Sequence, residues 1–219
     1  MTHITDPLTV WQADLPLERY GSSNDGGYVI CDAIPCDAFL SGGINDDNRF
    51  ELDVLGSYKY LVCHAYDPSG AGGAPHERYH FHAERVPVMG LESSRHALVK
   101  LDIEGDEWDW LQACPYLDHV AQFVLELHSP HLGRWSWPEL ERLARTHALI
   151  HAHGNNWDGI VDIEGVRVPG TLETTWVRRD LAGALRPNTR PIPGPLDRPN
   201  RVGVPDHVID WMPFVWSPA

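Results

Sequence analysis

Two apolar runs near the middle of the chain constrain the fold more than any other feature. They are HALVKLDIEG (96–105) and HVAQFVLELH (119–128), and a stretch that we expect to be helical from about Asp106 to Leu111 separates them. Continuous apolar runs of this length are typical of strands covered on both faces, and strands that alternate with helices are usually parallel. The pattern therefore predicts an α/β protein built on a mostly parallel sheet.

The rest of the chain supplies further strand and helix candidates around these two runs. Strands are expected at 28–31, 38–41, 58–67, 78–86, 148–156 and 170–179, and helices after Asp46 or Asp47 and after the Ser136–Glu139 capping box. The first of these helices would bury Phe50, Val54 and Leu55. We expect irregular structure in the first sixteen residues. Residues 1–185 are expected to form one domain, with the proline-rich segment 186–219 as an extension packed on it.

Charge narrows the range of partners. The chain of 219 residues has 31 acidic and 17 basic residues, a formal net charge of −14, and scattered Lys and Arg residues. Such a charge repels phosphate backbones and anionic lipids, so we expect a small polar substrate and neither nucleic acid nor a membrane as partner. No stretch resembles a transmembrane helix or a signal peptide, which predicts a cytoplasmic protein. The four cysteines lack metal-binding spacing and are expected to be reduced and buried.

Polar and titratable residues gather where the predicted strands end. They are Gly42, Gly43, Asn45 and Asp46 after the first strand of the sheet, Asp67 after the second, Asp102 and Glu104 after the fourth, Glu126 and His128 in the fifth, and His151, His153, Asn155 and Asn156 in and after the sixth. Each has an ordinary structural explanation, such as a helix cap for Asp46 or a hydrogen-bonded strand end for His151. Because ligands of such sheets bind outside the carboxyl ends of the strands, the whole set predicts a ligand pocket.

The turn after the first strand of the sheet narrows down the ligand. It reads SGGIND (41–46), without the G-x-G-x-x-G pattern of dinucleotide sites or the G-x-x-x-x-G-K-[ST] loop of nucleoside triphosphate sites. Glycines let a backbone approach a ligand closely, and Asp67 can accept hydrogen bonds from both hydroxyls of a ribose. An adenosine cofactor without a phosphate needs these two features, which points to S-adenosylmethionine.

The sequence resembles the FkbM-like and METTL24-like S-adenosylmethionine-dependent methyltransferases. The matching segments run in the family's order from about residue 18 to 214, and they are NDGGYVICD, SGGINDDNRFE, AYDPS, VKLDIEGDEWDWL, FVLELH, HAHGNN, LETTWVRR and LDRPNRVGVPDHVIDWMPF. The resemblance implies a Rossmann-like class I methyltransferase fold, with a seven-stranded sheet of order 3-2-1-4-5-7-6, helices on both faces and only strand seven antiparallel. It also implies O-methylation of a sugar or another small polar acceptor.

The resemblance also implies roles for residues at the strand ends. Gly42 and Gly43, with Asn45 in the same turn, match the cofactor-binding turn, and Asp67 matches the ribose-binding acid. Asp102 matches the acid that faces the methionine part of the cofactor and the acceptor. The turn departs from the usual G-x-G-x-G pattern of class I methyltransferases, so fewer glycines would approach the cofactor.

Methyl transfer to a hydroxyl needs a group that takes the proton. We expect His128 to be this general base, with His153 as second choice, because imidazole titrates near neutral pH. Asp102 or Glu126 would orient the ring, and Asn155 would hold the acceptor.

Two alternatives stay open at this point. Asp102, Glu126, His128 and His153 could instead hold a divalent metal ion that binds the acceptor hydroxyls. The chain could also be a methyltransferase-like binding subunit without catalysis, because its first turn has few glycines. Homo-oligomerisation is left open by the sequence.

Overall fold

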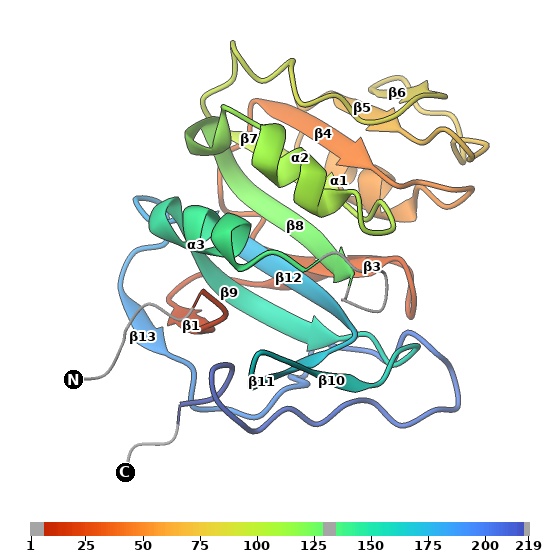
Figure 1. The fold of residues 1–219 in the computed structure, drawn as a ribbon. Coiled ribbons are helices and arrows are strands. Elements are labelled where there is room, and N and C mark those ends of the chain that lie inside the picture. Colours follow the sequence, from red (N-terminus) through yellow and green to blue (C-terminus); the bar gives the residue numbers. More distant parts are fainter. Residues whose placement is uncertain (1–6, 129–134, 217–219) are drawn as a thin grey trace.

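The computed structural model describes residues 7–128 and 135–216, and its centre is a seven-stranded sheet (Figure 1). The strands of this sheet are β4 (Ala38–Gly42), β5 (Cys63–Tyr66), β6 (Tyr79–His82), β7 (Ala97–Leu101), β8 (Val120–His128), β9 (His147–Gly154) and β12 (Thr171–Arg178). The α-helices of the described residues are α1 (Arg49–Ser57), α2 (Glu107–Ala113) and α3 (Trp137–Thr146), and a short 3-10 helix, Leu117–His119, leads into β8.

The strand order of the central sheet is β6-β5-β4-β7-β8-β12-β9. Numbered by their order along the chain, the seven strands are therefore arranged 3-2-1-4-5-7-6. β12 pairs antiparallel with β8 and with β9, and the other neighbours pair in parallel. The α/β class predicted from the apolar runs is confirmed, and so are the strand order and the single antiparallel strand implied by the resemblance.

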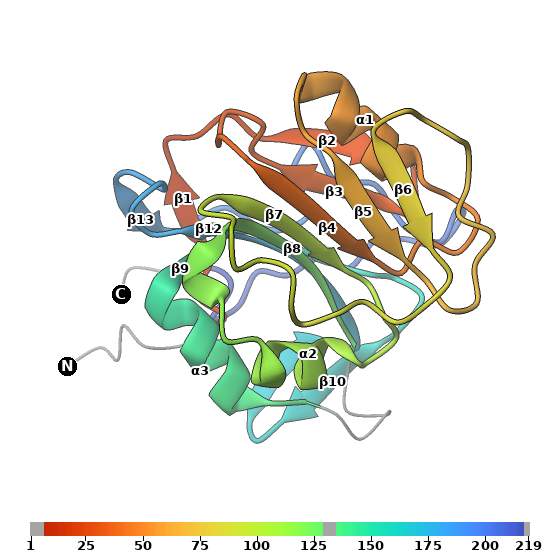
Figure 2. The ribbon, with the colours of Figure 1, turned by 90° about the horizontal axis from the view of Figure 1, so that it is seen from above.

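The two faces of the sheet have different coverings (Figure 2). One face carries α1 and a hairpin of β2 (Glu18–Gly21) and β3 (Gly27–Ile30), and the other carries α2 and α3. Side chains of successive strand residues point to opposite faces, so β7 serves both. Its Leu98 lies in the core with α1, whereas Val99 lies in the core with α2 and α3. This two-sided burial explains the continuous apolar run in the sequence.

The predicted α1 face is confirmed, since Phe50, Val54 and Leu55 are buried against the sheet. The helix begins at Arg49, slightly later than a cap at Asp46 or Asp47 would place it. Asp47 still satisfies the first turn, because its Oδ1 accepts a hydrogen bond from the backbone N–H of Arg49 at 3.1 Å.

The predicted capping box before α3 does not form. The Ser136 hydroxyl hydrogen-bonds the carboxylate of Glu139, and neither side chain caps a backbone N–H at that end. The two groups that the box should direct to the backbone bind each other instead.

Five short strands lie outside the sequence-based predictions: β2 and four others. β1 (Trp11–Ala13), within the stretch expected to be irregular, pairs with β13 (Leu185–Pro187). β10 (Ile160–Ile163) and β11 (Val166–Pro169) form a hairpin beside the sheet. A strand whose partner lies far along the chain has no local signal, and the β10–β11 turn uses Glu164-Gly165, a weak turn dipeptide, with positive φ at both residues.

The segment after β13, which we call the strap (residues 188–210), runs along the β9 side of the sheet (Figure 1). Buried polar contacts hold it there: Asp197 binds His151, Asn200 binds Glu173, and Asp206 binds His153. The backbone oxygen of Pro199 also accepts a hydrogen bond from Asn24 in the β2–β3 turn at 2.7 Å. The strap therefore connects the sheet edge to the hairpin on its face.

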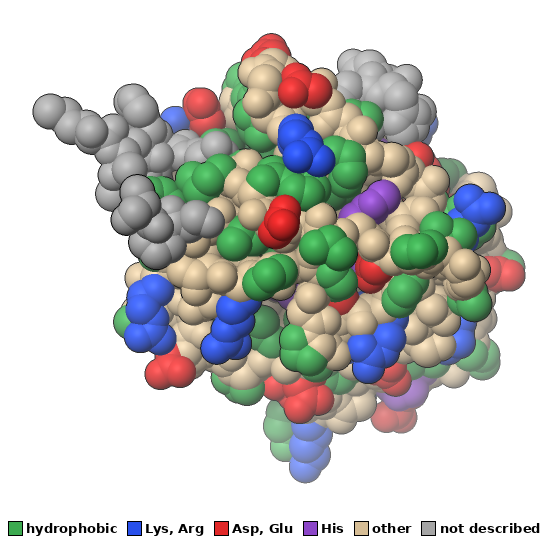
Figure 3. Space-filling model, turned by 90° about the horizontal axis from the view of Figure 1, so that it is seen from below, with side chains coloured by type: hydrophobic (Ala, Val, Ile, Leu, Met, Phe, Trp, Pro, Cys, Tyr) green, Lys and Arg blue, Asp and Glu red, His purple; other side chains and the backbone are tan. Residues whose placement is uncertain are grey.

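Basic side chains are dispersed on the face shown in Figure 3, where hydrophobic and neutral side chains separate the Lys and Arg residues. Within residues 7–128 and 135–216, every helix is too short or too polar to span a bilayer.

Candidate functional site

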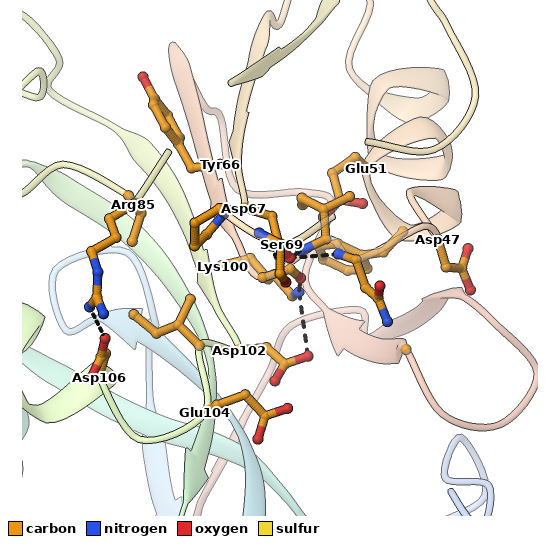
Figure 4. Close-up of a pocket in the computed structure, with 18 of the residues that line it drawn as sticks. Asp47, Glu51, Tyr66, Asp67, Ser69, Arg85, Lys100, Asp102, Glu104 and Asp106 are labelled. Carbon is orange, nitrogen blue, oxygen red and sulfur yellow. Dashed lines mark hydrogen bonds and ion pairs between the residues drawn. The ribbon is translucent and has the colours of Figure 1, made fainter. Parts of the chain in front are cut away.

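A cleft of about 840 Å³ opens at the carboxyl ends of β4, β5 and β7 (Figure 4). It is lined by the turn after β4, the end of β5, the residues that follow β7, the start of α2 and the turn of the β2–β3 hairpin. Gly43, Asn45, Asp67, Asp102 and Glu104 are among its lining residues. Clefts of roughly 300–1,000 Å³ hold cofactor-sized ligands, and this one lies at the predicted edge of the sheet.

The glycine turn brings two strands together. Gly43 has a φ of +79°, and a Cβ at this position would lie 1.6 Å from the backbone oxygen of Asp102. Only glycine fits there, and its N–H donates to the oxygen of Tyr66 at 3.0 Å. The sequence-based prediction is that the glycines approach a cofactor closely. In the structure, Gly43 instead lies close to the backbone of Asp102, directly after β7. The turn is therefore fixed to both neighbouring strands before any ligand binds.

Asp67 is fully engaged with the surrounding backbone. Its Oδ2 accepts hydrogen bonds from the N–H groups of Ile44 (2.9 Å) and Asn45 (2.7 Å), and its Oδ1 accepts from Ser69 and from the N–H of Gly70. Burial raises the pKa of this carboxyl, but the hydrogen bonds from Asn45, Ser69 and Ile44 outweigh burial and lower the pKa to about 2. The ionised Asp67 thus joins the first turn to the loop after β5, and a ribose would share its oxygens with these donors.

Asp102 is one of the polar residues that line the cleft. Its Oδ2 accepts a hydrogen bond from the Tyr28 hydroxyl at 2.7 Å and lies 3.6 Å from the Lys100 ammonium. Lys100 is itself buried, and it donates to the backbone oxygen of Gly43. Its charge is therefore matched within the site, as a buried ammonium requires.

Glu126 and Asn155 lie behind Asp102 and are buried. Asn155 donates through Nδ2 to Glu126 Oε1 at 2.9 Å, and its Oδ1 accepts from the backbone N–H of Trp157 at 3.0 Å. The sequence predicts that Asn155 holds the acceptor, but both ends of its amide are used inside the protein. Burial, followed by the charges of Asp102 and Glu173, raises the pKa of Glu126 well above its usual range.

His128 ends β8 beside the cleft. Its Nδ1 lies 3.0 Å from the buried Glu107 carboxylate, and its Nε2 lies 3.6 Å from Glu104 and 4.0 Å from Asp102. Burial lowers the pKa of the ring, but the hydrogen bond to Glu107 and the charges of Glu107, Glu126 and Asp102 outweigh burial and raise the pKa to about 9. Glu107 therefore fixes the ring with Nε2 directed at the two cleft carboxylates.

His153 has a different environment from the one a base requires. Its side chain is 0% exposed, its Nδ1 lies 2.8 Å from Glu173, and its Nε2 lies 3.0 Å from Asp206 of the strap. Burial lowers the pKa of the ring, but the hydrogen bonds to Asp206 and Glu173 outweigh burial and raise the pKa to about 10. A protonated ring with both nitrogens engaged cannot take a proton from an acceptor. The structure makes His153 a buried link between strap and sheet.

Backbone strain marks two lining residues. Asn45 and Glu104 adopt positive φ angles of 52° and 57°, which residues other than glycine rarely adopt. Such conformations tend to cluster at ligand sites. At Glu104 the left-handed turn directs an 86% exposed side chain toward His128.

The lining of the cleft combines apolar and acidic side chains. Its apolar members include Tyr66, Val86, Val88, Ile103 and Trp110, and its acidic members include Asp102 and Glu104. An apolar wall suits a flat heterocycle, and an acidic wall suits a cationic group. This combination fits an adenosine cofactor that carries a sulfonium and an ammonium group.

Five residues of these networks are missing from the sequence-based set: Tyr28, Lys100, Glu107, Glu173 and Asp206. Two of them had a usable signal, because Lys100 is a charge inside an apolar run and Tyr28 follows the glycine turn of the β2–β3 hairpin. Glu107, Glu173 and Asp206 meet their histidines only through the tertiary fold.

Solved structures resemble this chain only distantly. No family model matches the sequence, and no curated protein matches it. A chain of the fibrillarin/Nop5p complex covers 65% of this chain and 72% of its own length at 8% identity and a TM-score of 0.40. A methyltransferase described as putative from Thermoplasma acidophilum covers 67% of this chain and 70% of its own length, at 8% identity and a TM-score of 0.36. The 23S rRNA methyltransferase ErmE covers 65% of this chain and 61% of its own length, at 11% identity and a TM-score of 0.34. By its strand order, the chain has the fold of class I methyltransferases.

One expectation about partners is contradicted by these neighbours. Net charge led to the prediction that nucleic acid is not a partner, yet the neighbour ErmE is a 23S rRNA methyltransferase. Overall charge averages over the whole surface and leaves the local surface around a cleft undetermined. The exclusion of nucleic acid is therefore withdrawn.

Proposed function

We propose that the protein is an S-adenosylmethionine-dependent methyltransferase that methylates an oxygen of a sugar or another small polar acceptor. The observation that carries this proposal is the cleft at the ends of β4, β5 and β7, which is lined by both apolar and acidic side chains. Membership of the FkbM-like and METTL24-like group is part of the proposal, and its support is the ordered set of motifs in the sequence.

The lining residues suit the parts of the cofactor. Tyr66, Val86 and Trp110 offer an apolar surface for adenine, and Asp102 offers a carboxylate for the cationic end. The turn at Asn45, which Asp67 fixes, lines the same cleft.

Bound S-adenosylmethionine supplies an activated methyl group. The cleft must hold the acceptor oxygen in line with the methyl carbon while the new C–O bond forms and the S–C bond breaks, and this orientation contributes most of the rate. In its neutral form, which a pKa of about 9 makes predominant only above that pH, His128 takes the acceptor proton at Nε2, and Glu107 holds the ring by Nδ1. We leave His153 and Asn155 out of the catalytic set because their polar atoms are already bonded inside the protein.

Calorimetry with S-adenosylmethionine tests the proposal most directly. We expect a measurable heat of binding at micromolar to sub-millimolar cofactor. Absence of binding at millimolar cofactor would instead favour the non-catalytic binding subunit. With a neutral monosaccharide panel and detection of S-adenosylhomocysteine, His128→Ala should abolish turnover and keep cofactor affinity. His119→Ala, at the other end of β8, is the matched control and should keep both.

A metal-assisted reaction is the second candidate, favoured by one observation. Ligand atoms of Asp102, Glu104 and His128 lie within 4.8 Å of one another in the described part of the chain, and mixed oxygen and imidazole ligands suit ions such as Mn²⁺. Of the four ligands predicted from the sequence, Asp102 and His128 belong to this cluster, whereas Glu126 and His153 are bonded elsewhere. Loss of activity in EDTA with recovery in Mn²⁺ would support the metal, and full activity in EDTA would exclude it.

A further inference from the structure

The NDGGY segment (24–28) of the β2–β3 hairpin reaches the cleft from outside the central sheet. Asp25, Gly26 and Tyr28 line the cleft, although the methyl-transfer proposal gives them no role. The hairpin sits firmly on the sheet face, because Gln122 of β8 exchanges two hydrogen bonds with the backbone of Cys31 at 2.8 and 3.3 Å. A residue on β3 is therefore held at a fixed distance from the strand ends.

Tyr28 uses this fixed position to contact two carboxyl groups. Its hydroxyl lies 2.7 Å from Asp102 Oδ2 and 3.1 Å from Glu126 Oε2, and the residue is 3% exposed. Its ring packs edge-on against Phe50 of α1 at 5.3 Å, and the Lys100 ammonium lies 5.3 Å from its centre. Packing thus fixes the ring, and the hydroxyl can hydrogen-bond to the two carboxyl groups.

The proton of the hydroxyl is directed at Asp102. Burial and the nearby carboxylates raise the pKa of Tyr28 well above its usual range, so the hydroxyl stays a donor. Asp102 Oδ2 is the nearer of the two acceptors, at 2.7 Å from the hydroxyl against 3.1 Å for Glu126 Oε2. Asn155 holds Glu126 from behind at 2.9 Å.

The Tyr28 hydroxyl makes a shorter contact with the Asp102 carboxylate than its charged neighbours do. Asp102 follows the last residue of β7, its side chain is 25% exposed, and its carboxylate lies 3.6 Å from Lys100 and 4.0 Å from His128. Without the Tyr28 hydroxyl the carboxylate could rotate away from the cleft.

We propose that Tyr28 is a positioning residue of the methyl-transfer site, which holds the Asp102 carboxylate toward the cofactor's cationic end. This inference rests on the proposed function, since it assigns Asp102 to S-adenosylmethionine. Under this proposal, the NDGGY segment forms the hairpin turn and also supplies the residue that positions Asp102.

The test is calorimetry with S-adenosylmethionine on four proteins: the parent, Tyr28→Phe, Asp102→Ala and the double variant. Tyr28→Phe keeps the packed ring and should weaken binding about ten-fold, the size expected for one hydrogen bond to a charged group. In the Asp102→Ala background the same change should have less than a two-fold effect, because nothing is left to position.

Tyr20→Phe is the matched control. Tyr20 is the register partner of Tyr28 on the same hairpin, and its hydroxyl also contacts a carboxylate, Asp32 at 2.9 Å, but away from the cleft. Its removal should leave cofactor affinity unchanged.

Two outcomes would overturn the inference while the proposed function stands. In one, Tyr28→Phe binds the cofactor as tightly as the parent. In the other, Tyr28→Phe weakens binding equally in both backgrounds, which would mean a general structural effect. If the parent protein does not bind S-adenosylmethionine at all, the proposed function fails first and this inference fails with it.

Discussion

Replacing His153 with glutamine should lower the stability of the protein by an amount that depends on pH and can be calculated from the structure. The ring lies between Glu173 and Asp206 and its pKa is raised from 6.5 to about 10. A group whose pKa is raised by folding adds stability at low pH, fully below pH 6.5, and this stability is lost as the pH rises through 10.

The size of the effect follows from the shift in pKa. At 1.36 kcal/mol per pH unit, the shift corresponds to about 5 kcal/mol as an upper limit. Glutamine can still donate to one carboxylate, so we expect a loss of roughly 3–4 kcal/mol at pH 6. A typical domain has about 5–15 kcal/mol of stability in total, so the His153→Gln variant would be close to unfolding there.

Urea unfolding followed by tryptophan fluorescence at pH 6, 8 and 10.5 measures this dependence, and the chain has nine tryptophans as reporters. The difference in unfolding free energy between the parent and His153→Gln should shrink steadily toward pH 10.5. Asp206→Asn removes one of the two carboxylates and should give a smaller difference with the same trend. A difference that is equal at pH 6 and pH 10.5 would refute the assignment of a buried imidazolium.

Three further predictions concern stability and reactivity. Gly43→Ala should cost about 3 kcal/mol or more in urea unfolding, because its Cβ would meet the oxygen of Asp102, whereas Gly56→Ala in α1 meets no atom within 4 Å and should cost nothing. Burial lowers the pKa of His147 to about 4, so stability should fall as the pH drops from 6.5 toward 4, and His147→Leu should flatten this fall in urea titrations; an unchanged slope would argue against a buried neutral ring. Burial raises the pKa of Cys36 to about 12, so this thiol should react with a disulfide reagent at pH 8 at least ten-fold more slowly in the native protein than in urea, and equal rates would show that it is exposed.

Much of the fold could be predicted from local patterns. Continuous apolar runs in the sequence predict strands β7 and β8, and the spacing of Phe50, Val54 and Leu55 predicts the buried face of α1. The strand order came from the family resemblance, because alternating strands and helices alone do not determine which strands are neighbours. β1 was not predictable, since its pairing partner β13 lies at the other end of the chain.

The candidate site was predictable as a place and less so as a set of contacts. Asp67 and Asp102 line the cleft because strand ends meet at one edge of a parallel sheet. The partners of those residues could not be read from spacing. Tyr28 approaches Asp102 from a hairpin outside the sheet, and Asp206 neutralises His153 from the strap. A histidine's role depends on what faces each ring nitrogen, and that information is tertiary.

The strap has a consequence for the order in which the protein is made. Asn24 and Asp25, beside the cleft, are held by Pro199 and Asn200, about 175 positions later in the chain. While the ribosome is still adding the last strands, the hairpin that carries Tyr28 has no anchor on that side. The contacts that hold the NDGGY segment on that side are therefore among the last to form as the chain is made.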